Sequence, residues 1–145
     1  MRAPGENKSG VEGAHVAAYI VAAGLWVSGA LWLVFHHFMM RKTAFGPSPD
    51  PLEHWWLVAH GAFAFASLWT LGLLWNVHIV RRWVANRHRL SGGVLLGATL
   101  VLMVTGYLLY YVGGDRSRAV IGLIHWGLGL LALLPFLIHW IVRER

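Results

Sequence analysis

Histidine is the residue type in this sequence best suited to chemistry, because the chain has nine histidines and no cysteine. His125 and His139 are 14 residues apart. On a helix this spacing leaves them about 40° apart in direction and ~21 Å apart along the axis. His60 and His78 are 18 residues apart, which is five complete turns and ~27 Å. Each pair therefore shares one helix face at two depths.

A neutral imidazole is a good metal ligand, and two imidazoles at matched depth can bind a haem iron from opposite sides. If the helices that carry the two pairs are antiparallel, His60 reaches the level of His125 and His78 that of His139. The distance along the helix from His60 to His78 is about 6 Å longer than that from His125 to His139, so helix tilt or a bulge must absorb one extra turn. His15 lies at the level of His139 and is the alternative to His78 as the fourth ligand.

The absence of cysteine limits the cofactor to one that histidine, oxygen ligands or packing can hold. It excludes disulfides, thiolate metal sites, iron–sulfur clusters and thioether-attached haem. Four histidines at two levels therefore predict two non-covalent b-type haems.

Four long uncharged windows must position these histidines. The chain of 145 residues is 57% hydrophobic and only 12% charged, against about 25% charged in typical soluble domains. Each window exceeds the roughly 20 residues that a helix needs to cross a bilayer. The windows are residues 13–40, 54–80, 90–114 and 119–142. We therefore predict an all-α fold, a four-helix transmembrane bundle with up-down-up-down topology.

The predicted organisation is a polar N-terminal tail, residues 1–13, and a single transmembrane domain, residues 14–145. The four helices are expected at about residues 14–40, 52–83, 90–112 and 118–142, with a proline-punctuated loop between the first two. Eight Lys and Arg residues flank the side that carries both termini and four flank the other. The positive-inside rule then places both termini in the cytoplasm, and we expect a bacterial inner membrane. The high pI of about 10.5 reflects these flanking charges, so we expect no nucleic-acid partner.

An internal repeat relates the first two helices to the last two. Ser28-Gly29 corresponds to Thr105-Gly106. His60-Gly61 and the later His78 of the second helix correspond to His125-Trp126-Gly127 and the later His139 of the fourth. This pattern predicts a duplicated helical hairpin whose second helix carries the ligands, which favours His78 over His15.

Glycine and arginine supply two further features that a haem site needs. A flat macrocycle requires helix surfaces without side chains, for which Gly61, Gly106 and Gly127 are candidates. Haem propionates require donors at the membrane edges. The candidates are Arg81, Arg82 and His88 on the inner side, and Arg116 and Arg118 on the outer side.

These residues resemble the four-helix di-haem cytochrome b subunits of formate dehydrogenase and nickel–iron hydrogenase, and their small stand-alone relatives. The resemblance covers all four helices and is strongest in H125-x(13)-H139, where the family places one ligand for each haem. T105-G106-Y107-L108-L109 resembles the third helix, and His60 fits the ligand opposite His125. The family takes its remaining ligand from the start of the first helix, so the resemblance implies His15, whereas the repeat implies His78. The chain lacks the terminal extensions of the dehydrogenase subunits.

The sequence therefore predicts an electron-transfer protein that passes electrons between the quinone pool and a redox partner. That partner is expected to be a redox subunit or a periplasmic cytochrome or dehydrogenase, with ubiquinone or menaquinone as a further candidate cofactor. Quinone chemistry needs a proton donor or acceptor, for which His36, Glu53, His54 and Tyr111 are candidates. We expect a subunit of a membrane oxidoreductase, not an enzyme on its own, and the sequence leaves open whether it forms a homo-oligomer. The alternative is a non-redox membrane scaffold subunit or a histidine-lined metal transporter. The transporter is less favoured because no acidic residue lies within an uncharged window.

Overall fold

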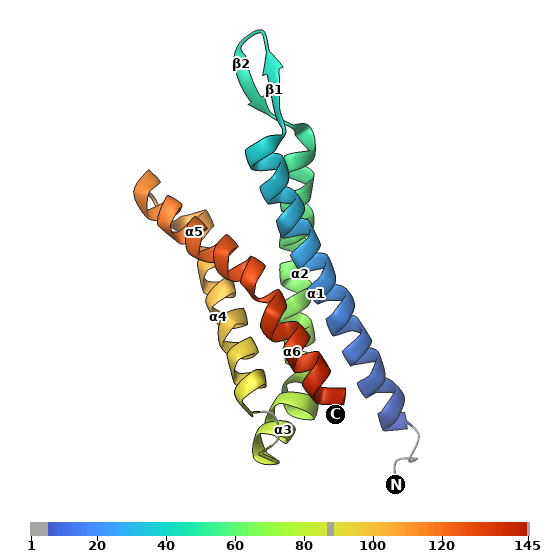
Figure 1. The fold of residues 1–145 in the computed structure, drawn as a ribbon. Helices are drawn as coiled ribbons and strands as arrows, with labels where there is room; N and C mark the ends of the chain where they lie inside the picture. Colours follow the sequence, from blue (N-terminus) through green and yellow to red (C-terminus); the bar gives the residue numbers. More distant parts are fainter. Residues whose placement is uncertain (1–5, 87–88, 145) are drawn as a thin grey trace. The chain divides into compact units, whose positions relative to one another are not determined.

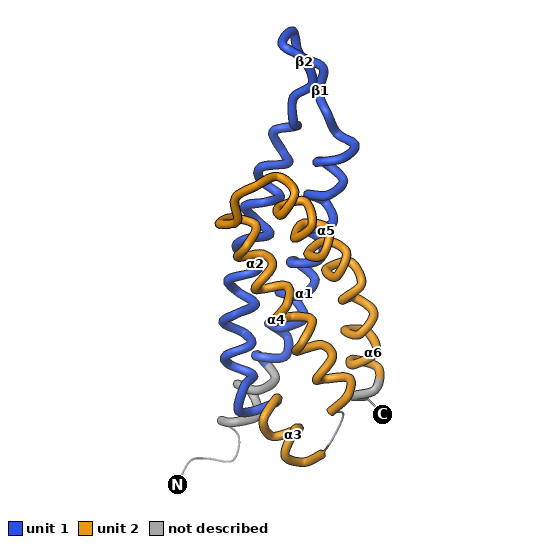
Figure 2. The backbone as a smooth tube through the Cα atoms, turned by 90° about the vertical axis from the view of Figure 1, so that its left-hand side faces the viewer, with its two compact units in different colours: residues 1–78 blue, residues 79–145 orange. Residues whose placement is uncertain are grey.

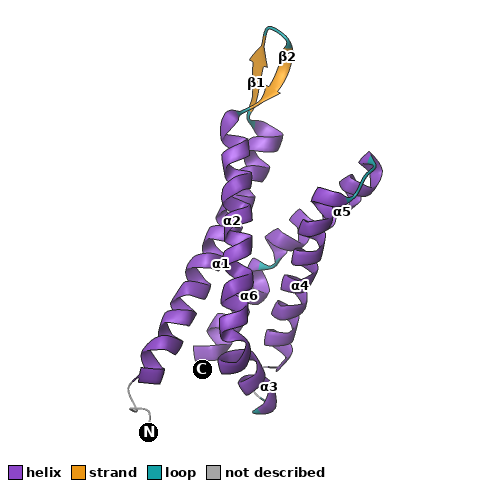
Figure 3. Ribbon diagram, turned by 180° about the vertical axis from the view of Figure 1, so that it is seen from behind, coloured by secondary structure: helices purple, strands orange, loops and turns teal. Residues whose placement is uncertain are grey.

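A computed structural model describes residues 6–86 and 89–144. It is 86% helical, which confirms the all-α class predicted from the uncharged windows. Figure 1 shows the elements and Figure 3 their types. They are α1 (Glu6–Phe38), β1 (Met40–Thr43), β2 (Gly46–Pro49), α2 (Pro51–Leu74), a π-helix η1 (Trp75–Val80), α3 (Arg81–Val84), α4 (Arg89–Tyr111), α5 (Asp115–Leu131) and α6 (Leu133–Glu144).

Four helical stretches of the described chain are long and apolar enough to cross a membrane. They are Gly13–Phe38, Pro51–Val84, Arg89–Tyr111 and Asp115–Ile141. No apolar side chain among the described residues is buried, while Ser28, Thr70 and Thr105 are. An apolar exterior with small polar residues between the helices is the arrangement that a lipid environment favours. The chain is therefore a multi-pass membrane protein.

The contacts divide the chain into two compact units, residues 1–78 and 79–145 (Figure 2). In the first unit α1 and α2 lie side by side, joined by the β1–β2 hairpin (Figure 1). In the second unit α4 packs against α5 and α6. Each unit thus contains one helical hairpin, as the internal repeat predicts.

The loop predicted between the first two helices is a β-hairpin, which the sequence analysis missed. Strands β1 and β2 pair antiparallel, with Thr43 opposite Gly46. Gly46 has φ of 110°, a conformation that glycine adopts without strain. Pro47 and Pro49 lack an N–H, but they alternate with Gly46 and Ser48, so the donors that remain lie on one edge of the strand. The prolines therefore permit strand pairing in the segment that was predicted to be a loop.

Asp50 fixes the start of α2. Its Oδ1 accepts a hydrogen bond of 2.9 Å from the backbone N–H of Leu52, and its Oδ2 accepts one of 2.6 Å from Arg41 Nε. The hydrogen bond from Leu52 is the main reason that the pKa of Asp50 lies below its usual value; partial desolvation opposes it, and Arg41 lowers the pKa further. The carboxylate therefore stabilises the junction between the β-hairpin and α2.

We expect Asp50→Ala to weaken this junction in a pH-dependent way. Because the folded pKa is lowered, the carboxylate contributes its stability above the unfolded pKa of about 3.9 and loses it as pH falls through the folded pKa. At pH 7 the amide of Leu52 should exchange with solvent several-fold faster in Asp50→Ala than in the unaltered protein. The difference should shrink in acid, as hydrogen exchange followed by mass spectrometry would reveal. Equal protection at pH 7 would contradict this role for Asp50.

The first helix begins at Glu6, about eight residues before the position expected from the uncharged window. The span itself begins at Gly13, so the extension is a polar helical segment of the predicted tail. Residues 1–5 of that tail lie outside the described part of the chain.

The second predicted helix, about 52–83, consists of three helical segments. The α-helix ends at Leu74, a π-helix occupies Trp75–Val80, and α3 follows. His78 lies inside the π-helix, whose wider turns change the direction in which later side chains project. The step from His60 to His78 thus contains the kind of bulge that its extra length requires.

The fourth predicted helix begins at Asp115 and is interrupted at Ala132. Pro135 has no N–H to donate to the carbonyl four residues earlier, and this missing bond falls at the junction of α5 and α6. The backbone bonds from Ala132 to Leu128 and from Phe136 to Ala132 keep the chain helical on both sides. The predicted fourth helix is confirmed as one span, Asp115–Ile141, with an interruption between His125 and His139 that was not predicted.

Candidate functional site

His60 lies against α1 in the first unit. Its Nδ1 is 3.0 Å from the carbonyl oxygen of Leu25 and 3.3 Å from Ser28 Oγ. Ser28 is only 2% exposed, so this contact is shielded between α1 and α2. His60 itself is half-buried.

His125 lies against α4 of the second unit in the same way. Its Nδ1 is 2.9 Å from Thr105 Oγ1, and Thr105 is 9% exposed. Two of the three buried residues of the described chain are therefore the hydroxyl partners of candidate ligands. The sequence repeat that aligns Ser28 with Thr105 and His60 with His125 corresponds to the same contact in both units.

The glycine after each hydroxyl makes room for the imidazole ring. A Cβ on Gly29 would lie 2.9 Å from His60 Cε1, and one on Gly106 would lie 3.2 Å from His125 Cε1. Both distances are shorter than ordinary contacts between carbon atoms. Gly106 was proposed to provide a flat surface for a macrocycle, but in the structure the space beside it holds the ring of His125.

His139 lies against α4 at a second level. Its Nδ1 is 3.1 Å from Ser91 Oγ, and a Cβ on Gly92 would come within 3.6 Å of its Cε1. Ser91 and Thr105 are 14 residues apart, as are His139 and His125. Despite the interruption at Ala132, both histidines thus meet α4, which confirms that they share a face at two depths.

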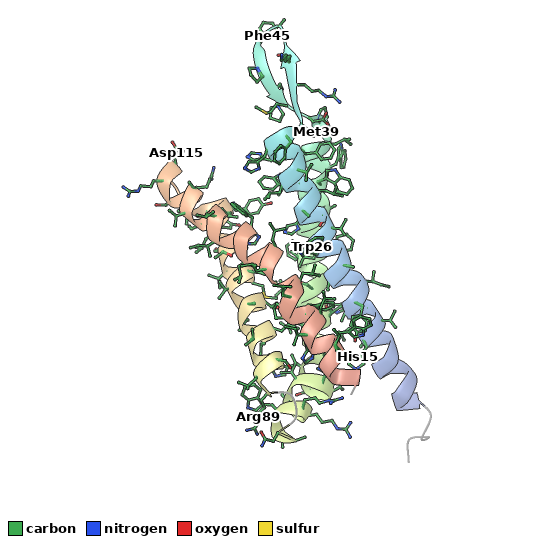
Figure 4. All side chains as sticks on the ribbon, viewed as in Figure 1. His15, Trp26, Met39, Phe45, Arg89 and Asp115 are labelled. Carbon is green, nitrogen blue, oxygen red and sulfur yellow. The ribbon has the colours of Figure 1, made fainter. Side chains whose placement is uncertain are left out.

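His15 and His78 lie together in the first unit. Their ring centroids are 5.1 Å apart and the rings are inclined at 79°. Figure 4 shows His15 among the side chains of α1. His60 and His78 thus both face α1, and the two candidates for the fourth ligand occupy one place. His15 stands in the position that Ser91 holds in the second unit, because each contacts the second histidine of its hairpin.

The pairs that the sequence analysis proposed for the two haems, His60 with His125 and His78 with His139, each take one residue from either unit. What the structure brings together lies within each unit, where every candidate ligand contacts the neighbouring helix of its own hairpin. The five candidate histidines are all half-buried, whereas His36, His37 and His54 are exposed.

Gly61 and Gly127 present bare backbone beside the candidate ligands. A Cβ on either would meet no atom of the described chain within 4 Å. Of the predicted propionate donors, Arg82 is half-buried and Arg81, Arg116 and Arg118 are exposed. His88 lies outside the described residues.

Among the candidates for proton exchange with a quinone, the structure pairs His36 with Glu53. The distance from His36 Nδ1 to Glu53 Oε1 is 2.7 Å, and the His36 ring stacks on Trp32 with centroids 4.7 Å apart. Glu53 Oε2 and Trp56 Nε1 are buried atoms without a hydrogen-bond partner in the described chain. His54 and Tyr111 are exposed.

The partners of the histidines are the residues that sequence reasoning missed. Ser28, Gly29 and Thr105 were noticed as a repeat but given no role, and Ser91 was not considered. The signal was available, since Ser91 and Thr105 repeat the 14-residue spacing of His139 and His125 on the neighbouring helix.

No protein-family model, curated protein or solved structure matches this chain. The function must therefore be argued from its own sequence and geometry.

Proposed function

We propose that the protein is a di-haem membrane cytochrome b that passes electrons between the quinone pool and a redox partner. The observation that carries this proposal is the repeated contact of a half-buried histidine with a buried hydroxyl, Ser28 with His60 and Thr105 with His125. Ionisable residues within membrane helices are costly and are usually functional. Two of them in equivalent surroundings on duplicated hairpins indicate one function used twice.

The residues fit a haem in their donor chemistry and in the surface beside it. Imidazole is a strong iron ligand, and on the helices that carry His60 and His125 a Cβ at Gly61 or Gly127 would meet no described atom of a neighbouring helix within 4 Å.

Each of the four histidines His60, His78, His125 and His139 would supply one nitrogen ligand to a haem iron. Their sequence levels support pairing His60 with His125 and His78 with His139, with His15 as the alternative to His78. When bound, haem b supplies a one-electron iron couple. The apolar helices around the histidines exclude water and keep the surroundings at low dielectric, which is one means by which a protein sets a redox potential.

The flanking charges serve orientation and anchoring in this proposal. Arg81 and Arg82 on one side, and Arg116 and Arg118 on the other, would neutralise carboxylates at the membrane edges. The excess of Lys and Arg on the side of the termini supports a cytoplasmic location for both ends in a bacterial inner membrane. The His36–Glu53 pair supports proton exchange with ubiquinone or menaquinone at the opposite edge.

Haem quantitation with a reduced-minus-oxidised spectrum tests the proposal. The purified full chain from a haem-replete host should carry two b-type haems, and acid–acetone should extract all of its colour because no cysteine can hold haem covalently. A colourless protein from the same host would overturn the proposal and favour a scaffold or transport role. A ratio of one haem per chain would contradict the di-haem form.

A further inference from the structure

Each of the two buried hydroxyls lies within hydrogen-bond distance of a carbonyl oxygen in its own helix, to which it can donate its hydrogen. Thr105 Oγ1 donates to the carbonyl oxygen of Val101, at 2.8 Å, four residues earlier in α4. Ser28 Oγ donates to the carbonyl oxygen of Gly24, at 2.7 Å, in the same manner. A hydroxyl has a single hydrogen, so once it is donated to the helix backbone, the oxygen can only accept from a further neighbour.

That neighbour is the Nδ1 atom of the imidazole in both units. Thr105 Oγ1 lies 2.9 Å from His125 Nδ1; with its own hydrogen donated to Val101, it accepts from an imidazole that carries hydrogen on Nδ1. His60 leads to the same conclusion independently, because its Nδ1 also lies 3.0 Å from the carbonyl oxygen of Leu25, which is an acceptor only. In a neutral imidazole with hydrogen on Nδ1, Nε2 carries the lone pair.

We propose that Thr105 and Ser28 are positioning residues that hold His125 and His60 in the tautomer whose Nε2 is the ligand nitrogen. This inference rests on the proposed haem-binding function, but it concerns the imidazoles themselves. A donor bond from Nδ1–H also makes a ligand more basic, so the hydroxyls stabilise the more positive, oxidised state of the iron. Gly106 and Gly29 complete each arrangement by leaving room for the ring to approach the hydroxyl.

The repeat argues against an incidental contact. The hydroxyl donates to a carbonyl four residues earlier, lies near one three residues earlier, and meets a histidine of the next helix in both units. Ser and Thr at the two positions share only the hydroxyl and the bond that it makes. Bonds to carbonyls three or four residues earlier also occur at Ser67 and Thr99, so the feature that chance packing does not explain is the recurring contact with a histidine of the next helix.

Thr105→Val tests the proposal, because valine keeps the shape of threonine and removes the hydroxyl. Thr105→Ser restores the hydroxyl. Thr99→Val is the matched control, since Thr99 Oγ1 donates to Leu95 at 2.8 Å in the same helix and contacts no histidine that the structure describes. All variants are made in the full chain.

The first measurement is the ¹⁵N spectrum of histidine-labelled full chain produced without haem, in which the two tautomers give distinct nitrogen shifts. Thr105→Val should lower the fraction of His125 with hydrogen on Nδ1, while Thr105→Ser and Thr99→Val should leave it unchanged. Ser28→Ala should have a smaller effect on His60, because the carbonyl of Leu25 remains as an acceptor.

The second measurement is made on haem-loaded protein. Thr105→Val should weaken haem binding at His125 by about tenfold or more, as loss of an outer-shell partner typically does, and should raise the midpoint potential of that haem. Unchanged tautomer and potential in Thr105→Val would overturn the positioning role and leave the haem proposal intact. A haem-free native protein with the Nδ1–H tautomer would instead contradict the proposed function alone.

Discussion

His125→Ala should reduce the haem content from two per chain to one. His125 is the candidate ligand with the most completely defined surroundings, held by Thr105 at 2.9 Å and given room by Gly106. His139 lies 14 residues further on, about 21 Å along the helix, and meets a different partner, Ser91. Removal of His125 should therefore leave the second haem in place. Pyridine haemochrome quantitation against protein concentration measures the ratio.

His37→Ala is the control for this experiment. His37 is exposed, and its Nδ1 bonds to the carbonyl of Leu33 in its own helix, at 3.1 Å. The His37→Ala variant should retain two haems per chain. Loss of both haems from His125→Ala, with helix content preserved, would show that the two sites depend on each other.

His78→Ala should abolish the six-coordinate, low-spin signal of the haem proposed to bind to His78 and His139, here called the inner haem, whereas His15→Ala should preserve it. The structure strengthens the reason for this expectation. His15 contacts His78 as Ser91 contacts His139, so by the repeat His15 is the partner and His78 the ligand. His78 also lies in a π-helix, a feature frequent at functional sites.

Electron paramagnetic resonance and absorption spectra of the two variants decide between the histidines. Because the rings are 5.1 Å apart, His15→Ala should shift the inner signal without making it high-spin. If His15→Ala alone removes the low-spin signal, the ligand comes from the first helix and the assignment of His78 is wrong.

The parts of the fold that the sequence could predict are those governed by average polarity. Uncharged windows of 24 residues or more can be accommodated in a bilayer only as helices, and all four are helical. The repeat also predicted two equivalent hairpins correctly, because it compared residues of similar chemistry at similar spacing. Neither prediction required knowledge of hydrogen-bond directions.

The errors concern local backbone geometry. Pro135 lacks an N–H at the interruption of the last helix. The proline is visible in the sequence, but the average hydropathy of the window does not register a missing hydrogen-bond donor. Pro47 and Pro49 suggested a loop, but their alternation with residues that retain an N–H allows a strand. The π-helix at His78 has no simple sequence signature, since one additional residue per turn leaves the polarity pattern nearly unchanged.

In the candidate site, the sequence identified the histidines and the structure supplied their partners. Matching depths predicted that His125 and His139 share a face, and their contacts with Thr105 and Ser91 agree. The role of the glycine was misjudged, because the spacing of residues along one helix does not show which neighbouring side chain fills the space beside it. Gly106 leaves room for the ring of His125, whereas a Cβ on Gly61 or Gly127 would meet no described atom of a neighbouring helix within 4 Å.

The contact of His60 with Ser28 and Leu25 has a consequence for the order in which the chain is synthesised and inserted. An imidazole entering the hydrocarbon region with an unsatisfied N–H incurs a desolvation penalty. Here the acceptors lie on α1, which leaves the ribosome before α2. His125 likewise follows Thr105 of α4. Each histidine thus enters the bilayer after its acceptor, and each hairpin can satisfy its own polar groups while the remainder of the chain is still being made.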